Sequence, residues 1–335
     1  MNTEYRIDSE NKWIPDGFHF LGPEAAKKRR RLLLTARTFF EEQGFLEVIP
    51  PAFDFSSTFY SHLSSGERDS ILKLKDLNGY EVSPSVDLTL QVVKGMAGFA
   101  RKNEDNRVFY TGKVIKDNRR ENADRREFQQ FGVEILGSSG YDTLLELFFS
   151  IDGLMSKLGI EGNQFTLVLG NVQVYSGLAR CMGLDTGDMQ KLSQLVYAKN
   201  RLDMHAFLEE KGVGKEFGRT LDKMLLSFSL DEIKPDLLKV SEKNSLGLEV
   251  CIAETEKILQ ANSKLKHLEL CLDYSLLRDL DYYTGFVFHA YVSGIPMPVF
   301  MGGAYDHLYE KFSGVQKNAC GFALNLELLQ ILLDK

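Results

Sequence analysis

The stretch from Leu276 to Gly285, LLRDLDYYTG, is the feature of this 335-residue chain that most constrains its fold. Two adjacent tyrosines stand between a charged run and a Thr-Gly turn. They come just before the aromatic and β-branched segment 286–292, which predicts a strand. A tyrosine combines a flat apolar ring with a hydroxyl group that needs a hydrogen-bond partner when it is buried. Composition alone favours an ordinary surface strand with exposed tyrosines, and other segments of the chain are needed to show whether the tyrosines have a function.

The segment 128–137, FQQFGVEILG, shows the clearest alternation of side-chain type. Successive side chains of a strand point to opposite faces, so the Phe, Val and Ile at positions 131, 133 and 135 should face the core. The other face carries Gln130 and Glu134 on either side of Gly132, which leaves room for a ligand. An exposed strand edge would show the same pattern, and the residues alone favour that alternative.

Other periodic segments predict a chain of mixed helices and strands. Pro23 should open a helix that ends at Gln43, because proline suits the first helical turn and the following glycine is a natural stop. Asn78-Gly79 predicts a type I′ hairpin turn within residues 71–83. Asp87 is a candidate N-cap of a helix that reaches about residue 100. We further expect strands over 45–51, 107–116, 164–169 and 268–272, a hairpin over 287–303, and helices over 141–158 and 322–333.

Charge and cysteine spacing limit the possible functions. The formal net charge is −7, which argues against a dedicated nucleic-acid binder because such proteins usually carry a basic surface. The basic run Lys27–Arg31 is interpreted as the solvated face of a helix rather than a phosphate site. The four cysteines lie far apart without a C-x-x-C pair, so we expect no metal site, no disulfide and a cytoplasmic location. No apolar run reaches about 18 residues, so no membrane span is expected.

Four segments resemble histidyl-tRNA synthetases, which are class II aminoacyl-tRNA synthetases. Residues 276–285 are similar to the family's LVRGLDYYTG signature, and residues 128–134 to its FHQFGVE string. Residues 83–89 resemble its R-P-(D/E)-x-T segment, although Ser83 replaces the arginine and Asp87 could serve only as a helix cap. The helix from Pro23 and the strand that ends at Pro51 resemble the first class II motif, which builds a dimer interface. The resemblance implies a histidine pocket made by Asp87, Thr89, Arg126, Gln130, Glu134, Arg278, Tyr282 and Tyr283.

The chain departs from the synthetases where they contact ATP. The family string FRYE aligns with Ile115–Asn118, the string AGGRYD with Met301–Asp306, and the string GLER with Asn325–Leu328. A guanidinium group binds phosphate through paired, oriented hydrogen bonds, which neither lysine nor an apolar side chain can reproduce. Lys116, Ala304 and Leu328 therefore stand at lost ATP-binding positions. The chain also stops soon after the third motif, so we expect no anticodon-binding domain and no tRNA charging.

Taken together, the motifs most resemble the regulatory subunits of ATP phosphoribosyltransferase, a shortened family related to the synthetases. The resemblance implies an α+β class II core over 1–171 and 264–335, with an antiparallel sheet flanked by helices and an inserted helical subdomain over 172–263. It implies a non-catalytic homodimer without cofactors that joins a short-form catalytic subunit in a hetero-oligomer, with L-histidine as feedback effector. Two alternatives stay open: an amino-acid-adenylating ligase, and a stand-alone histidine sensor or RNA-binding pseudo-synthetase.

Overall fold

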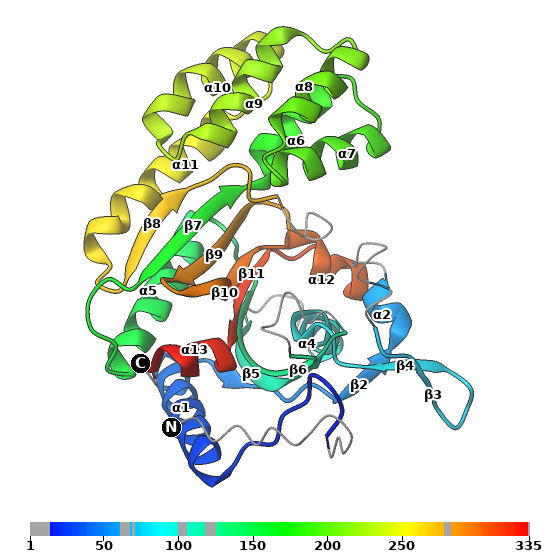
Figure 1. The fold of residues 1–335 in the computed structure, drawn as a ribbon, viewed down its shortest axis with the longest axis vertical. Coiled ribbons are helices and arrows are strands. Elements are labelled where there is room, and N and C mark those ends of the chain that lie inside the picture. Colours follow the sequence, from blue (N-terminus) through cyan, green and yellow to red (C-terminus); the bar gives the residue numbers. More distant parts are fainter. Residues whose placement is uncertain are drawn as a thin grey trace.

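An eight-stranded sheet forms the centre of the molecule. The computed structural model describes residues 14–60, 68, 71–99, 106–117, 125–277 and 283–333. In order across the sheet the strands are β1 (Leu46–Glu47), β5 (Asn106–Ile115), β6 (Glu127–Leu136), β11 (Ala319–Asn325), β10 (Ile295–Ala304), β9 (Phe286–Val292), β7 (Phe165–Asn171) and β8 (Leu268–Leu272). Only the two edge pairs, β1 with β5 and β7 with β8, are parallel. The predicted α+β architecture of a largely antiparallel sheet with flanking helices is confirmed (Figure 1).

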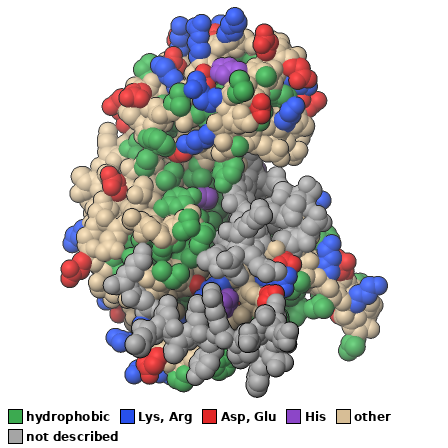
Figure 2. Space-filling view, viewed as in Figure 1, with side chains coloured by type: hydrophobic (Ala, Val, Ile, Leu, Met, Phe, Trp, Pro, Cys, Tyr) green, Lys and Arg blue, Asp and Glu red, His purple; other side chains and the backbone are tan. Residues whose placement is uncertain are grey.

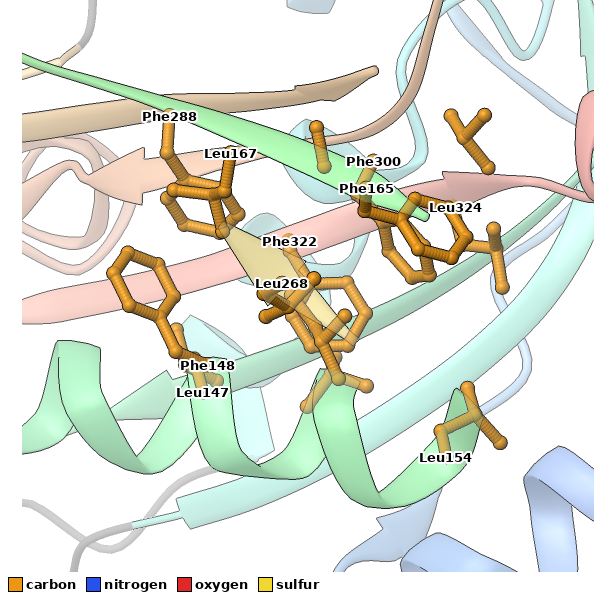
Figure 3. Packing of buried hydrophobic residues seen from close by; sticks show 14 of the residues in the cluster. Leu147, Phe148, Leu154, Phe165, Leu167, Leu268, Phe288, Phe300, Phe322 and Leu324 are labelled. Carbon is orange, nitrogen blue, oxygen red and sulfur yellow. The ribbon is translucent and has the colours of Figure 1, made fainter. Parts of the chain in front are cut away.

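One face of the sheet is covered by α1 (Pro23–Glu42), α5 (Tyr141–Lys157) and α13 (Leu326–Leu333). Their apolar side chains interlock with those of the strands, as the ring pairs in the core show (Figure 3). Phe148 of α5 meets Phe288 of β9 edge to face, with ring centroids 4.9 Å apart. The residues of β6 predicted to face the core, at positions 131, 133 and 135, lie in this cluster. Burying each such side chain contributes about 1.5–3 kcal/mol.

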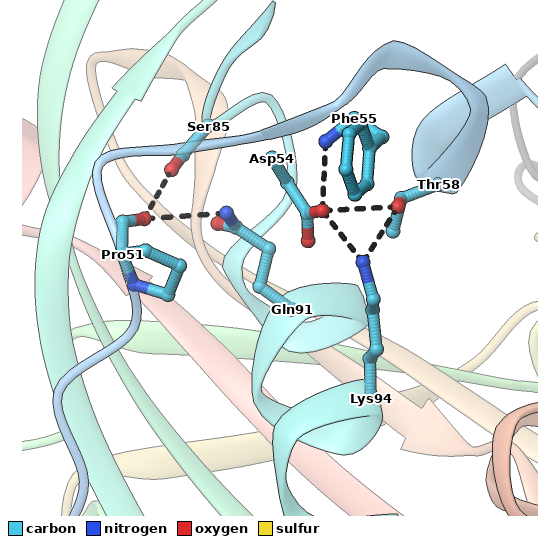
Figure 4. A network of polar contacts seen from close by, with 7 residues as sticks. All are labelled: Pro51, Asp54, Phe55, Thr58, Ser85, Gln91 and Lys94. Atoms are coloured by element: carbon cyan, nitrogen blue, oxygen red, sulfur yellow. Dashed lines mark hydrogen bonds and ion pairs between the residues drawn. The ribbon is translucent and has the colours of Figure 1, made fainter. Parts of the chain in front are cut away.

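The opposite face carries α4 (Leu88–Phe99), α12 (Asp306–Ser313), α2 (Ser56–Tyr60) and a small sheet with the strand order β2 (Phe53–Phe55), β4 (Glu81–Pro84) and β3 (Leu74–Lys75). Polar contacts tie the small sheet to α4 (Figure 4). Lys94 donates to Asp54 over 2.6 Å, and the carbonyl oxygen of Pro51 accepts from Ser85 over 3.1 Å and from Gln91 over 3.2 Å. These bonds fix the start of α4 against the sheet.

Six further helices form a separate group, which we call the helical body. They are α6 (Val172–Cys181), α7 (Thr186–Tyr197), α8 (Arg201–Glu210), α9 (Lys215–Leu226), α10 (Leu230–Asn244) and α11 (Glu249–Gln260), and the 3₁₀ helix η2 (Ala261–Lys264) leads back to the sheet. Polar side chains cap the first helices, as when Asn171 accepts the N–H of Gln173 over 2.9 Å. The helices share a hydrophobic cluster of their own. The helical character expected for 172–263 is confirmed, and the domain boundaries stay a prediction.

Two local predictions were wrong. The N–H of Gly79 donates to the carbonyl of Asp76 over 3.0 Å, and Asp76 pairs with Tyr80, which makes a three-residue loop instead of a type I′ turn. The Asp76 carboxylate favours this loop because it accepts the N–H groups of Asn78 and Tyr80. Residues 319–325 form strand β11, so the last helix begins at Leu326 instead of residue 322. Within the described ranges, none of the helices has the length and apolar character that a membrane span requires.

Candidate functional site

Glu134 lies at the centre of the face that β6 turns away from the core, and only 1% of it is exposed. It pairs across the sheet with Gly321 of β11, which in turn pairs with Gly303 of β10. A Cβ atom at Gly321 would lie 1.7 Å from Oε2 of Glu134, so the carboxyl group extends directly over this glycine. Two neighbouring glycines therefore make the floor of the site flat enough for a buried carboxyl group.

Two tyrosines hold the carboxyl group of Glu134. The hydroxyl of Tyr110 on β5 donates to Oε1 over 2.8 Å, and the hydroxyl of Tyr305 donates to Oε2. Oγ1 of Thr89 lies 2.9 Å from the Tyr110 hydroxyl, and Nε2 of Gln130 donates to the same hydroxyl over 3.3 Å. Because Tyr110 gives its one proton to Glu134, Thr89 must be the donor in its own contact. The predicted residues Thr89, Gln130 and Glu134 are thus brought into one network.

Burial shifts the ionisation of this network. It raises the pKa of Glu134 to about 8, against the opposing effect of the hydroxyl donors Tyr305, Tyr110 and Thr89, while the charge of Asp87 raises the pKa further. Burial and the charge of Glu134 likewise hold the pKa of Tyr110 and Tyr305 well above the usual value. A carboxyl group with this pKa is mostly protonated near neutral pH and ionises readily when a cation approaches. It can therefore accept a hydrogen bond from a cationic nitrogen or donate one to a neutral nitrogen.

Asp87 caps helix α4 beside the network. Its Oδ1 accepts the N–H of Leu90 over 3.1 Å, so the predicted cap is confirmed. Asp87 is also close enough to the site for its negative charge to raise the pKa values of Glu134 and Tyr110. A second role as the partner of an ammonium group stays a prediction.

Tyr283 lies on the floor of the site next to these residues. A Cβ atom at Gly303 would lie 2.8 Å from Cε1 of Tyr283, so the tyrosine ring covers this glycine. The ring also packs against the cluster that contains Tyr305. Arg278 and Tyr282, the two other predicted residues of the same stretch, lie outside the described residues.

Arg126 is held at the end of the β5–β6 hairpin where the connecting loop joins the two strands. Its Nε and Nη2 atoms donate to the carboxylate of Asp117 over 2.5 and 2.8 Å. Its N–H donates to the carbonyl of Gly17 over 2.8 Å, and its backbone carbonyl accepts the N–H of Lys116 over 2.9 Å. These contacts place Arg126 and Lys116 together, and the contact of Arg126 with a ligand stays a prediction.

The two other positions that align with arginines of the synthetases are buried. Ala304 at the end of β10 is 3% exposed, and Leu328 in α13 is 2% exposed and belongs to the main core cluster. The neighbouring Glu327 accepts from Arg29 over 2.7 Å and from the N–H of Gln129 over 2.8 Å. Burial raises the pKa of Glu327, and the charge of Arg29 opposes that shift.

This contact corrects the interpretation of the basic run 27–31 as a solvated face. The other four residues are exposed, but Arg29 turns inward to reach the buried carboxylate of Glu327. A buried carboxylate near a helix needs such a partner. The helical spacing that places Arg29 on the side of Leu32 and Ala36 was the available signal.

Sequence reasoning missed the two partners of Glu134. Tyr110 lies on β5 directly opposite Gly132, where a Cβ atom would lie 2.1 Å from its ring. Tyr305 lies between Ala304 and Asp306, within the segment that aligns with the synthetase string AGGRYD. The alternation of β5 could have placed Tyr110 on the site face, but its partner depends on the strand register, which local patterns do not give.

Known proteins are similar to this chain in sequence and in fold. A family model described as histidyl-tRNA synthetase matches residues 17–329. A Leptospira interrogans protein named ATP phosphoribosyltransferase regulatory subunit is 42% identical over 333 residues, which cover 98% of this chain and 96% of the relative. A protein of the same name from Caldanaerobacter subterraneus is 27% identical over 324 residues, which cover 96% of this chain and 83% of the relative.

Solved structures confirm the fold. A Bacillus halodurans structure, described as an ATP phosphoribosyltransferase regulatory subunit/histidyl-tRNA synthetase, is similar with a TM-score of 0.79 at 20% identity, covering 98% of this chain and 83% of that one. The structure of a histidyl-tRNA synthetase from a Nostoc species is similar with a TM-score of 0.76 at 19% identity, covering 97% of this chain and 76% of that one. The family model spans nearly the whole chain, and the alignment with the 42% identical relative runs almost end to end in both proteins. The chain therefore belongs to the histidyl-tRNA synthetase-like family of ATP phosphoribosyltransferase regulatory subunits.

Proposed function

We propose that this chain is a regulatory subunit of ATP phosphoribosyltransferase that has no catalytic activity of its own. The observation that carries the proposal is the contrast between two sets of positions. Thr89, Gln130 and Glu134 form one connected network, whereas Ala304 and Leu328, which replace arginines of the synthetases, are buried and apolar. A site that keeps its amino-acid pocket and lacks the cations needed to stabilise a phosphate suits binding without adenylation.

The ligand that we propose for the Glu134 pocket is L-histidine. Its imidazole can share a proton with the carboxyl group of Glu134, whose pKa of about 8 lets it act as donor or acceptor. Its ammonium group can face Asp87 at the start of α4, and Tyr283 offers a ring surface on the floor. Arg126, Arg278 and Tyr282 complete the set that the family resemblance implies.

We further propose that the chain forms a homodimer, which assembles with a short-form catalytic subunit. Strand β1 lies at the edge of the large sheet; its Leu46 is 71% exposed, and Ile49, two residues after the strand, is 85% exposed. An edge strand with exposed apolar side chains is suited to contact another chain. The contact between copies is expected to involve the helix and strand within residues 23–51.

The test is co-expression with a short-form catalytic subunit, followed by assays of phosphoribosyl transfer with and without histidine. We expect the complex to be active and inhibited by histidine. Glu134→Ala should weaken histidine binding roughly five- to 150-fold, because it leaves polar groups without a partner in a desolvated site. Binding and inhibition are linked by one coupling free energy, so the inhibition curve should shift by the same factor.

The matched control is Glu269→Ala, which removes an exposed carboxylate from strand β8. This variant should bind histidine and respond to it as the unaltered chain does. If Glu134→Ala leaves the inhibition curve in place while the complex stays active, inhibitory histidine binds elsewhere. If the chain neither binds the catalytic subunit nor alters its activity, the regulatory proposal is wrong.

A further inference from the structure

The segment that leads from β8 toward the pocket belongs to the packing of the helical body. Leu272, Tyr274 and Leu277 lie in the hydrophobic cluster of helices α6–α11, and the Tyr274 hydroxyl donates to Thr255 of α11 over 3.4 Å. Lys199, between α7 and α8, pairs with Asp273 of the segment over 2.8 Å. Hydrophobic side chains gather on the face just below the helical body (Figure 2). The segment is therefore shaped by the helical body rather than by the sheet alone.

Thr284 lies at the end of the segment that joins β8 to β9, and it holds this end against the sheet. Its Oγ1 donates to Oδ2 of Asp306 over 3.0 Å and accepts the N–H of Asp306 over 2.9 Å. Its own N–H donates to the carbonyl of Ala304 over 2.8 Å. Asp306 is itself fixed, because its Oδ1 accepts the N–H of Ala319 on β11 over 3.0 Å. One threonine hydroxyl thus locks the backbone beside Tyr283 to the start of α12.

The helical body reaches the same two residues from the other side. The N–H of Val172, the first residue of α6, donates to the carbonyl of Gly285 over 3.0 Å. Nε2 of Gln173 donates to the carbonyl of Thr284 over 3.0 Å. Both donors come from the first turn of α6, so Thr284 and Gly285 join the helical body to the floor of the pocket.

Tyr283 lies between the first turn of α6 and the cluster that contains Tyr305. Its ring packs against the cluster of Val172, Leu276 and Val287, which joins the start of α6 to β9, and against the cluster of Tyr305. Tyr305 in turn donates to Glu134. A continuous series of contacts therefore runs from α6 through Tyr283 to the carboxyl group at the centre of the site.

We propose that Thr284 is a positioning residue, and that the junction of Thr284 and Gly285 couples the helical body to the affinity of the Glu134 pocket. The proposal rests on histidine as the ligand of that pocket. Coupling between two sites is reciprocal, so ligand in the pocket also stabilises the contact of α6 with the junction. The helical body is then the part of the molecule through which pocket occupancy alters the shape of the subunit.

The test uses the full chain and two substitutions at one position. Thr284→Val keeps the shape of the side chain but removes both hydrogen bonds to Asp306, whereas Thr284→Ser keeps the hydroxyl. By calorimetry, Thr284→Val should bind L-histidine roughly five- to 150-fold more weakly than the unaltered chain. Thr284→Ser should bind within about threefold of it. Thermal unfolding of both variants shows that the compared proteins are folded.

Hydrogen exchange measures the helical-body half of the proposal. Adding histidine to the unaltered chain should slow the exchange of the Val172 amide and of the first turn of α6, and this protection should be lost in Thr284→Val. If histidine binds the unaltered chain but α6 exchanges at an unchanged rate, the coupling is refuted while the proposed function stands. Equal affinity of folded Thr284→Val and the unaltered chain refutes the positioning role. A failure of the unaltered chain to bind histidine overturns the ligand assignment and this inference together.

Discussion

The buried carboxyl group of Glu134 should make the stability of the protein fall as the pH rises. A glutamate in an unfolded chain titrates near about 4.3, and the folded protein raises the pKa of Glu134 to about 8 because the group is desolvated. Between these values the folded state keeps a proton that the unfolded state has lost. The contribution of Glu134 to stability is therefore fully present below about pH 4.3 and is lost as the pH rises through about 8.

The size of the effect follows from the shift. One pKa unit corresponds to about 1.4 kcal/mol, so the free energy of unfolding should fall by up to about 1.4 kcal/mol per pH unit, and by roughly 5 kcal/mol across the window. Glu134→Gln removes the titration and keeps the shape of the side chain. Its carboxamide can still accept from Tyr110 and can donate to the oxygen of Tyr305, so both tyrosines keep a partner.

The assay is urea unfolding of the two proteins from pH 5 to pH 9, without histidine and at one protein concentration. Other titrating groups are common to both proteins, so they cancel in the difference between the two free energies. We expect Glu134→Gln to gain stability relative to the unaltered chain as the pH rises, with a plateau above about pH 8. Parallel stability curves would mean that Glu134 is ionised throughout this pH range in the folded protein, so that burial does not raise its pKa.

Other predictions concern the ATP-facing positions, the core and the assembly. The chain should show no exchange of labelled pyrophosphate into ATP with histidine, since each missing charge donor costs about 2.7–4 kcal/mol of transition-state stabilisation, and robust exchange would favour the ligase alternative. Leu328→Arg should lower the free energy of unfolding by several kcal/mol without restoring exchange, because it puts an unpaired charge into the core. Arg29→Ala should cost about 3 kcal/mol in urea unfolding by leaving Glu327 unpaired, whereas Arg30→Ala on the exposed side of the same helix should change stability by less than about 0.5 kcal/mol. Light scattering should give a dimer, and Ile49→Asp should favour the monomer; a monomeric unaltered chain would contradict the proposed contact through residues 23–51.

Local patterns predicted the parts of the fold that depend on a short stretch of chain. The two faces of β6 followed from its alternation, and the start and end of α1 followed from Pro23 and Gly44, because these signals act within one element. The start of the last helix was wrong because the apolar run from Phe322 to Leu324 suits a buried strand as well as a helix. This run becomes a strand because it pairs with β6, and that pairing links residues far apart in the sequence.

The candidate site was predictable only in part for the same reason. Gln130 and Glu134 could be named because they share one strand face and because their string resembles a known family. Tyr110 and Tyr305, which hold the carboxyl group, come from two other elements, and only the sheet register and the start of α12 bring them together. The inward turn of Arg29 also depended on a distant partner, since Glu327 lies at the opposite end of the chain.

The burial of Leu328 has a consequence for how proteins of this kind evolve. The Leu328 side chain, which aligns with the arginine of the synthetase string GLER, is 2% exposed and contributes to the main core. A single substitution to arginine would place a charge in that core, at a cost comparable to much of the 5–15 kcal/mol that keeps a typical domain folded. A descendant of this chain would first need to open space and supply a counter-charge around α13 before the arginine could be tolerated. The packing around Leu328 thus keeps arginine out of this position until neighbouring residues have changed first.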